Sequence, residues 1–182
     1  IGNKSIAEGA PLTFAVTAQD PDAGQILKFS LDAGAPGGAV INASSGVFTW
    51  TPAEQQGPAT YNITVRVTDD GTPALSDFET ITMTVNEVNA APTLAAFADR
   101  AVAPGVIVTF TADAKDTDVP AQAITFSLDA APAGAAINPG TGVFSWTPTV
   151  AQAGKTHSIT VVAADNGTPS LNAAHTFNVT VV

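Results

Sequence analysis

The chain has 182 residues, of which 16 are acidic and 6 basic, so its formal net charge at pH 7 is -10. This balance argues against nucleic acid as a partner, because phosphates require a basic surface. The absence of cysteine excludes disulfides and thiolate metal sites, and no apolar run reaches the ~18 residues that would indicate membrane insertion. Because the sequence starts at Ile1 without a leader pattern, we expect it to be a segment of a longer protein.

An internal repeat organises the chain. The pentad at 48–52 (FTWTP) returns at 144–148 as FSWTP, and the turn sequence at 69–73 (DDGTP) returns at 165–169 as DNGTP, each 96 positions later. A period of this length is typical of tandem whole domains rather than of small solenoid repeats. We therefore predict two domains, over 1–88 and 89–182, with a joint at 86–92.

In chain order, apolar residues alternate with small polar ones, as half-buried strands require. Turn residues predict a loop at 20–24. The pattern predicts strands near 12–17, 27–31, 40–41, 47–50, 61–67 and 81–85, and in the second copy near 108–112, 126–128, 143–146, 159–163 and 177–181. Short strands separated by turns predict an all-β fold of two tandem seven-stranded Greek-key β-sandwiches.

Aromatic residues divide into two groups. Trp50 and Trp146 each stand two positions after a phenylalanine, Phe48 and Phe144, and so lie on the same face of the predicted strand. Both tryptophans are therefore predicted to pack in the core. Phe78 and Phe97 fit no inward position, so they are the candidates for a carbohydrate-stacking surface. His157 replaces Tyr61 in the second copy and is predicted to be an ordinary strand residue.

Three runs together indicate a family. The runs at 45–52 (SGVFTWTP), 61–71 (YNITVRVTDDG) and 85–92 (VNEVNAAP) resemble bacterial cadherin-like repeats, of the dystroglycan-type cadherin-like and "Putative Ig" (He_PIG-like) kinds. The resemblance implies cadherin-like or Ig-like sandwiches in an extracellular or cell-surface secreted protein. It also implies neighbouring repeats as partners, and a role in adhesion, in a stalk or beside a polysaccharide-degrading enzyme.

The resemblance implies calcium sites as well, because cadherins bind calcium between successive domains. Positions that match the ligand pattern at the joint are Glu8, Glu54, Glu87, Asn89, Asp116, Asp118 and Asp165. Gln56 and Ala90 stand where the family usually has acids, so we expect weak binding, in the range of about 10⁻⁴ to 10⁻³ M of extracellular modules. Calcium prefers such hard oxygen ligands, and it would relieve the repulsion among converging carboxylates.

The two copies differ at the ends of the predicted sandwiches. Glu8 corresponds to Pro104 and Glu54 to Val150, so we expect the far end of the second domain to be free of metal. At the other end of the first domain, three acids form a possible incomplete site: Asp20, Asp22 and Asp69. The first 90 residues carry 10 acids and 3 bases, whereas the rest carry 6 acids and 3 bases, in agreement with this asymmetry.

Two alternatives stay open at this stage. The Asp-rich loops are also ordinary turn sequences, in which Asp caps its own backbone. The function is predicted to be a calcium-stiffened structural or adhesive module, and the alternative is a carbohydrate-binding accessory module. Surface polysaccharide or homophilic contact would then be the partner. No enzyme is expected, because Gly-x-Ser-x-Gly, His-Glu-x-x-His and phosphate-binding Gly loops are missing from the sequence.

Overall fold

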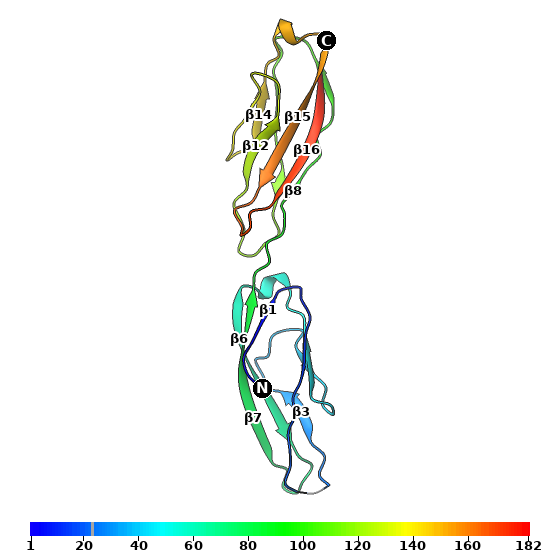
Figure 1. Ribbon diagram of the computed structural model, residues 1–182, viewed down its shortest axis with the longest axis vertical. Coiled ribbons are helices and arrows are strands. Elements are labelled where there is room, and N and C mark those ends of the chain that lie inside the picture. The colour runs from blue at the N-terminus through cyan, green and yellow to red at the C-terminus, as the bar shows by residue number, and fades with distance from the viewer. Residues whose placement is uncertain (23) are drawn as a thin grey trace. The chain divides into compact units, whose positions relative to one another are not determined.

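Alternating apolar residues form strands in both copies of the repeat (Figure 1). The structure is a computed structural model that describes residues 1–22 and 24–182; Ala23, within the loop predicted at 20–24, lies outside the described residues. The chain divides into two units, Ile1–Val88 (unit 1) and Asn89–Val182 (unit 2). The prediction of an all-β fold of two sandwiches is confirmed.

Unit 1 has two sheets. Its strands are β1 (Lys4–Ala7), β2 (Leu12–Ala15), β3 (Lys28–Leu31), β4 (Val40–Ile41), β5 (Val47–Trp50), β6 (Ala59–Thr68) and β7 (Ser76–Asn86), with a 3-10 turn, η1 (Glu54–Gln56). One sheet has the order β1-β7-β6-β3 and the other β2-β5-β4. β1 runs parallel to β7, which brings the residue after β1 close to the end of β7. This parallel pairing positions the candidate site described below.

The core of unit 1 lies between these sheets. Phe48 and Trp50 of β5 pack with Ile63 of β6 and with Ile81 and Met83 of β7, all of them almost fully buried. Inward residues are two apart because successive side chains of a strand point to opposite faces. Each fully buried side chain of this size contributes about 1.5–3 kcal/mol to the stability of the fold.

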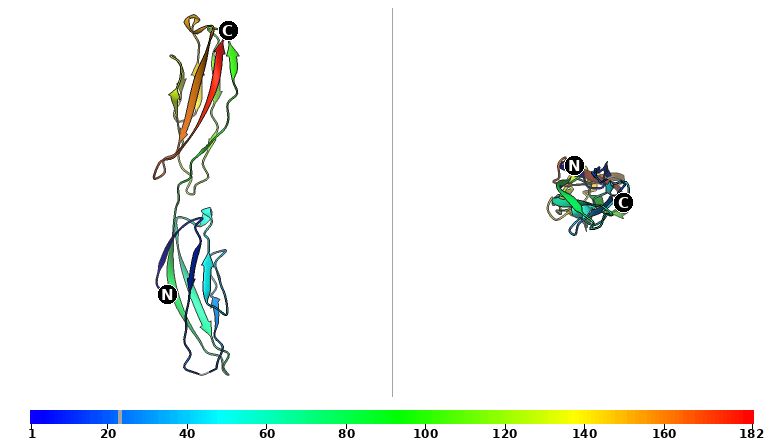
Figure 2. Two further views of the ribbon diagram at one scale, coloured as in Figure 1. Left: turned by 45° about the vertical axis from the view of Figure 1, so that its right-hand side comes forward. Right: turned by 90° about the horizontal axis from the view of Figure 1, so that it is seen from below.

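Unit 2 repeats this plan and adds one small sheet. Its strands are β8 (Thr93–Leu94), β9 (Arg100–Val102), β10 (Val108–Thr111), β11 (Ala114–Lys115), β12 (Thr125–Ala130), β13 (Ala136–Ile137), β14 (Val143–Trp146), β15 (Lys155–Ala164) and β16 (Asn172–Val181), with a 3-10 turn, η2 (Val150–Gln152). The sheets have the orders β12-β15-β16-β9, β10-β14-β13 and β11-β8. The long hairpin of β15 and β16 is visible in Figures 1 and 2. The β8–β11 pair was not predicted.

The aromatic predictions for the core are confirmed in part. Trp50 and Trp146 are 2% and 1% exposed, as predicted. His157 is a strand residue whose ring lies edge-on against Trp146. The prediction that Phe97 lies outside the core was wrong. Its ring packs against Phe110 and Phe177, because the irregular segment after β8 folds back over the core.

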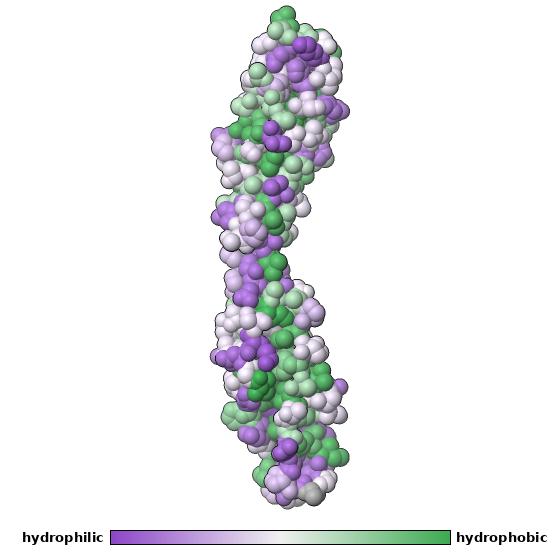
Figure 3. Space-filling model, in the orientation of Figure 1, coloured by the Kyte–Doolittle hydropathy of each residue, from purple (hydrophilic) through white to green (hydrophobic). Residues whose placement is uncertain are grey.

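On the face drawn in Figure 3, hydrophobic residues are interspersed with hydrophilic ones. Within residues 1–22 and 24–182, no helix has the length and apolar character that crossing a membrane demands.

Candidate metal centre

Three carboxylates converge at one end of unit 1. Glu8, Glu54 and Glu87 each offer an oxygen, and these oxygens lie within 4.8 Å of one another. In the described part of the chain, this is the one group of three or more acids so arranged. Figure 1 shows η1 (cyan) at the end of unit 1 where β7 (green) finishes. The sequence prediction had assigned all three residues to one site, and the structure brings them together.

Backbone bonds hold this acidic cluster, Glu8 with Glu54 and Glu87, in place. Glu8 follows β1, and its N–H donates to the carbonyl of Asn86 at the end of β7 (3.0 Å). Glu54 opens η1, and Glu87 directly follows β7. The N–H of Val88 donates to Oε1 of Glu8 (3.1 Å), which ties the end of β7 to the carboxylate. The parallel pairing of β1 with β7 therefore determines which acids meet.

The electrostatics of Glu8 favour a positive partner. The residue is 7% exposed, and its Oε2 atom is buried without a hydrogen-bond partner among the described residues. Burial raises the pKa of Glu8 above its ordinary value, and the negative charge of Glu54 raises it further, although the hydrogen bond from Val88 lowers it. A proton or a cation at this position would relieve the cost of the buried charge.

Gly57 leaves room for the carboxylate. A Cβ atom built on Gly57 would collide with Oε2 of Glu8 and would approach Cγ1 of Val85 to 3.1 Å. The backbone of Gly57 has φ of -120°, which any residue adopts, so space rather than conformation requires glycine here. In unit 2, Ala153 stands at the position of Gly57, and Pro104 stands at the position of Glu8. Unit 1 therefore has both the glycine and the buried glutamate, and unit 2 has neither at these positions.

Unit 2 has four of the predicted ligand residues near its start and in the turn after β15. Asp118 is 3% exposed and accepts hydrogen bonds from the N–H of Ala90 (3.2 and 3.0 Å). The N–H of Asp118 donates to Oδ1 of Asp116 (2.9 Å), whereas Oδ2 of Asp116 is buried without a partner among the described residues. Asn89 donates from Nδ2 to Oδ2 of Asp165 (3.1 Å). The four predicted residues Asn89, Asp116, Asp118 and Asp165 are therefore linked within this unit.

Asp165 is held as an anion by its turn. Burial raises its pKa, but the N–H groups of Leu171 and Gly167 and the side chain of Asn89 lower it more, so the net pKa is below the ordinary value. The two N–H groups donate to Oδ1 at 2.9 and 3.0 Å. Oδ2 accepts from Asn89, as described above. The carboxylate therefore stays charged at neutral pH and can attract a cation.

Gln122 belongs to this set and was missed by the sequence prediction. Its Nε2 donates to Oδ2 of Asp118 (2.8 Å) and to Oδ1 of Asn89, while its Oε1 is buried without a partner among the described residues. Oδ2 of Asp118 and Oδ1 of Asn89 therefore both already accept a hydrogen bond from Gln122. The sequence held a signal, because Gln25 stands at the corresponding place in the first copy; among the described residues, its Oε1 is likewise buried without a partner.

The predicted incomplete site at the other end of unit 1 is built from turns. Oδ1 of Asp20 accepts from the N–H of Asp22 (2.8 Å), and Oδ1 of Asp69 accepts from the N–H groups of Gly71 and Leu75 (both 2.9 Å). Asp20, Asp22 and Asp69 line one hollow of about 220 Å³ but lie outside the converging group of acids. Turn chemistry, the alternative left open above, accounts for these bonds.

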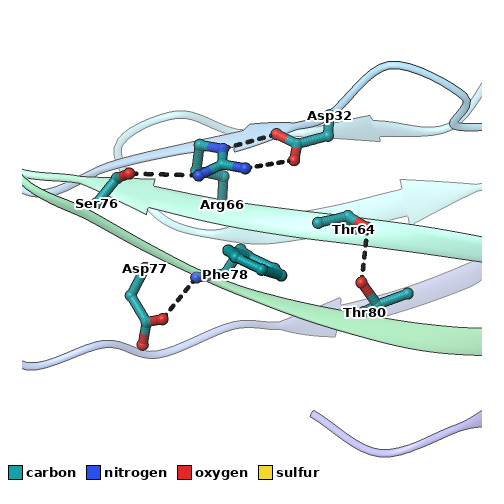
Figure 4. Close-up of polar contacts among 7 residues, drawn as sticks. All are labelled: Asp32, Thr64, Arg66, Ser76, Asp77, Phe78 and Thr80. Carbon is teal, nitrogen blue, oxygen red and sulfur yellow. Dashed lines mark hydrogen bonds and ion pairs between the residues drawn. The ribbon is translucent and has the colours of Figure 1, made fainter.

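Phe78 is exposed on the four-stranded sheet of unit 1. This exposure is what its prediction as a candidate for stacking on carbohydrate requires. Its side chain is 60% exposed, yet the guanidinium of Arg66 lies over its ring at 5.1 Å (Figure 4). Arg66 in turn donates to both oxygens of Asp32 (2.8 and 2.7 Å) and to Ser76 (3.3 Å). One face of the ring is therefore already covered by a polar network.

The fold defines two tandem β-sandwich repeats. The family model described as "Putative Ig domain" (He_PIG) matches residues 1–86 and again 91–182. The chain therefore belongs to this family and contains two copies of its domain.

Solved cadherins share this fold. Mouse cadherin-23 EC22-24 aligns with the whole chain at TM-score 0.59 and 21% identity, over 62% of that chain. Drosophila N-cadherin EC1-4 aligns with the whole chain at TM-score 0.63 and 17% identity, over 48% of that chain. A stretch of 78 residues, 41% of this chain, is 40% identical to human Protocadherin-23, of which it spans 2%. The chain is thus short beside the relatives that it matches.

Proposed function

We propose that the chain is a calcium-binding structural and adhesive module, a tandem-repeat segment of a larger secreted or cell-surface protein of the bacterial kind. Calcium rigidifies the joint between domains 1–88 and 89–182. The observation that carries this proposal is that carboxylate oxygens of Glu8, Glu54 and Glu87 lie within 4.8 Å of one another, and that Oε2 of Glu8 is buried with no hydrogen-bond partner among the described residues. Carboxylates placed so close repel one another unless a cation neutralises them.

The donor set fits calcium. Calcium takes six to eight hard oxygen ligands from carboxylates, amide carbonyls and water. Glu8, Glu54 and Glu87 supply carboxylates from unit 1, and unit 2 would add the oxygens of Asn89, Asp116, Asp118 and Asp165. Glu87 and Asn89 are two positions apart in the sequence, so the backbone itself tethers the two sets. Binding would require the amide protons of Gln122 to give up Asn89 and Asp118.

This exchange keeps the affinity modest. A cation must displace hydrogen bonds that already satisfy part of the donor set, and Gln56 and Ala90 bring no charge. We therefore expect a dissociation constant of about 10⁻⁴ to 10⁻³ M, as in extracellular modules. The turn-bonded acids Asp20, Asp22 and Asp69 would need ligands from a further domain, so we expect no calcium at that end of this chain.

Solution scattering tests the proposed function. The 182-residue chain is measured in millimolar calcium and in chelator, beside the double variant Asp116→Asn with Asp118→Asn. We expect calcium to narrow the distribution of interatomic distances for the natural chain and to leave that of the variant unchanged. An equally broad distribution with and without calcium would contradict a stiffening role. A broad distribution that narrows in both proteins would assign the ion to a site that does not use these aspartates.

Carbohydrate binding remains the second candidate, and exposed Phe78 is the observation that favours it. The ring could stack on a sugar through the face that Arg66 leaves open, with surface polysaccharide as the partner. Gels containing a panel of polysaccharides test this alternative. Retardation of the natural chain that is lost in Phe78→Ala would favour it, and unchanged mobility would remove it for this segment.

A further inference from the structure

One asparagine of unit 2 stands directly before a glycine. Asn166 and Gly167 lie in the turn between β15 and β16, and an Asn-Gly pair occurs only here in the sequence. The backbone nitrogen that follows an asparagine can attack the carbon of the side-chain amide. A glycine hinders this attack least, because it has no side chain and a permissive backbone. The pair is therefore the position in the chain where loss of an amide group meets the least hindrance.

Two hydrogen bonds engage the groups that would react. Asn166 is exposed, and its Oδ1 accepts the N–H of Ala123 (2.8 Å), which lies shortly before β12. The N–H of Gly167 donates to Oδ1 of Asp165 (3.0 Å). The first bond fixes the side chain of Asn166 against a neighbouring segment, and the second opposes removal of the proton from the attacking nitrogen. Both bonds therefore slow the attack while the turn is closed.

Unit 1 shows that an acid fits the same turn. Asp70 and Gly71 stand 96 positions before the Asn-Gly pair. Oδ1 of Asp70 accepts the N–H of Ile26 (2.8 Å), and the N–H of Gly71 donates to Oδ1 of Asp69 (2.9 Å). These two bonds correspond one to one with those of unit 2. An aspartate at position 166 would therefore keep both hydrogen bonds of the turn.

We propose that Asn166 is a site of deamidation, and that opening of the turn controls how fast the reaction proceeds. The nitrogen of Gly167 bonds to Cγ of Asn166 while its proton passes through water to Nδ2. The bond between Cγ and Nδ2 breaks, and ammonia leaves a cyclic imide behind. Water then opens the imide at one of its two carbonyls, which gives aspartate or isoaspartate with one new carboxylate. This inference does not depend on calcium.

The two products differ in their effect on the turn. Aspartate leaves the course of the backbone unchanged, and Asp70 is the example of such a turn in unit 1. Isoaspartate routes the main chain through the former side chain and so adds a carbon to it. This added length displaces the N–H of Gly167 from Asp165. The aspartate product is therefore the one that the folded turn accommodates.

The test follows deamidation of the full 182-residue chain by intact mass and peptide mapping, during incubation at mildly alkaline pH in chelator. The natural chain is incubated folded and, separately, unfolded in guanidinium chloride. Asp165→Ala removes the acceptor for the N–H of Gly167. Asp69→Ala is the matched control, because it removes the corresponding acceptor in unit 1. Thermal melts establish that each variant is folded at the temperature of the incubation.

We expect Asn166 to be the first asparagine modified, and to react at least about tenfold faster in the unfolded than in the folded natural chain, because the turn must open locally. In folded chains, Asp165→Ala should speed the reaction and Asp69→Ala should leave it unchanged. Equal rates in the folded and unfolded chain, or equal rates in the two variants, would overturn the proposal. If Asp165→Ala does not fold, the comparison of folded with unfolded natural chain decides alone.

Discussion

The N–H of Val88 donates a 3.1 Å hydrogen bond to Oε1 of Glu8, while the other oxygen of the same carboxylate is buried without a partner in the described part of the chain. Oε1 thus fastens the end of β7, and the carboxylate as a whole converges with those of Glu54 and Glu87. Oε1 of Glu8 therefore stabilises the fold through a hydrogen bond, whereas Oε2 is the atom that we propose contacts a cation. The predictions for Glu8 follow from this division.

Replacing Glu8 should change stability in opposite directions with and without calcium. Glu8→Gln keeps an acceptor for Val88 but removes one of three clustered charges. In chelator we expect the variant to melt a few degrees higher than the natural chain, because repulsion is relieved. In millimolar calcium the order should reverse, because the natural chain gains from binding. Thermal melts in both buffers measure the effect; the same order in both would contradict it.

The pH dependence of stability should also report on Glu8. Burial raises its pKa in the folded chain, so the folded state takes up this proton more readily than the unfolded state. In chelator, the cost of the charged Glu8 is fully present above the raised pKa and is lost as the pH falls from that pKa to the ordinary pKa of the unfolded state. The difference in unfolding free energy between the natural chain and Glu8→Gln should therefore shrink on acidification. Asp165 has a lowered pKa, so it loses stability on acidification in both chains. Subtracting one curve of unfolding free energy against pH from the other removes this shared contribution.

Gly57 should be required for the acidic cluster. A methyl group at this position collides with Oε2 of Glu8, so Gly57→Ala should displace the carboxylate and weaken calcium binding by about tenfold, or ~1.4 kcal/mol. Gly140→Ala is the matched control, because a Cβ there would lie at an ordinary contact distance of 3.8 Å from Oδ1 of Asn138. Calorimetric titration compares the two variants. Equal affinities would show that the space beside Glu8 is immaterial.

The contrast between two phenylalanines tests the assignment of the core. Phe144 is fully buried, and Phe144→Ala should cost about 3–5 kcal/mol of unfolding free energy. Phe78 is 60% exposed, and Phe78→Ala should change stability by no more than about 0.5 kcal/mol. Urea unfolding measures both values. A large loss for Phe78→Ala would mean that its contact with Arg66 stabilises the sheet.

Much of the fold could be predicted because strand alternation and the repeat are local signals. Trp50 and Trp146 were assigned to the core by parity alone, and both are buried. Phe97 and the β8–β11 pair could not be predicted. Two-residue strands carry too little alternation, and Phe97 sits in an irregular segment whose path depends on tertiary packing.

The acidic set was predictable for a different reason. Glu8, Glu54 and Glu87 are far apart in sequence, so residue spacing alone could not unite them; the family resemblance did, and the β1–β7 pairing explains how. Gln122 escaped because an amide in a loop carries no charge signal. Its match with Gln25 becomes informative only when the two copies are aligned.

The most direct test of the calcium proposal is a calorimetric titration of calcium into the 182-residue chain, paired with melts in calcium and in chelator. We predict binding heat with a dissociation constant of about 10⁻⁴ to 10⁻³ M, a higher melting temperature in calcium, and the loss of both in Asp116→Asn with Asp118→Asn. No heat and no shift in melting would contradict the proposal, and would mean that these carboxylates act only as turn and capping residues.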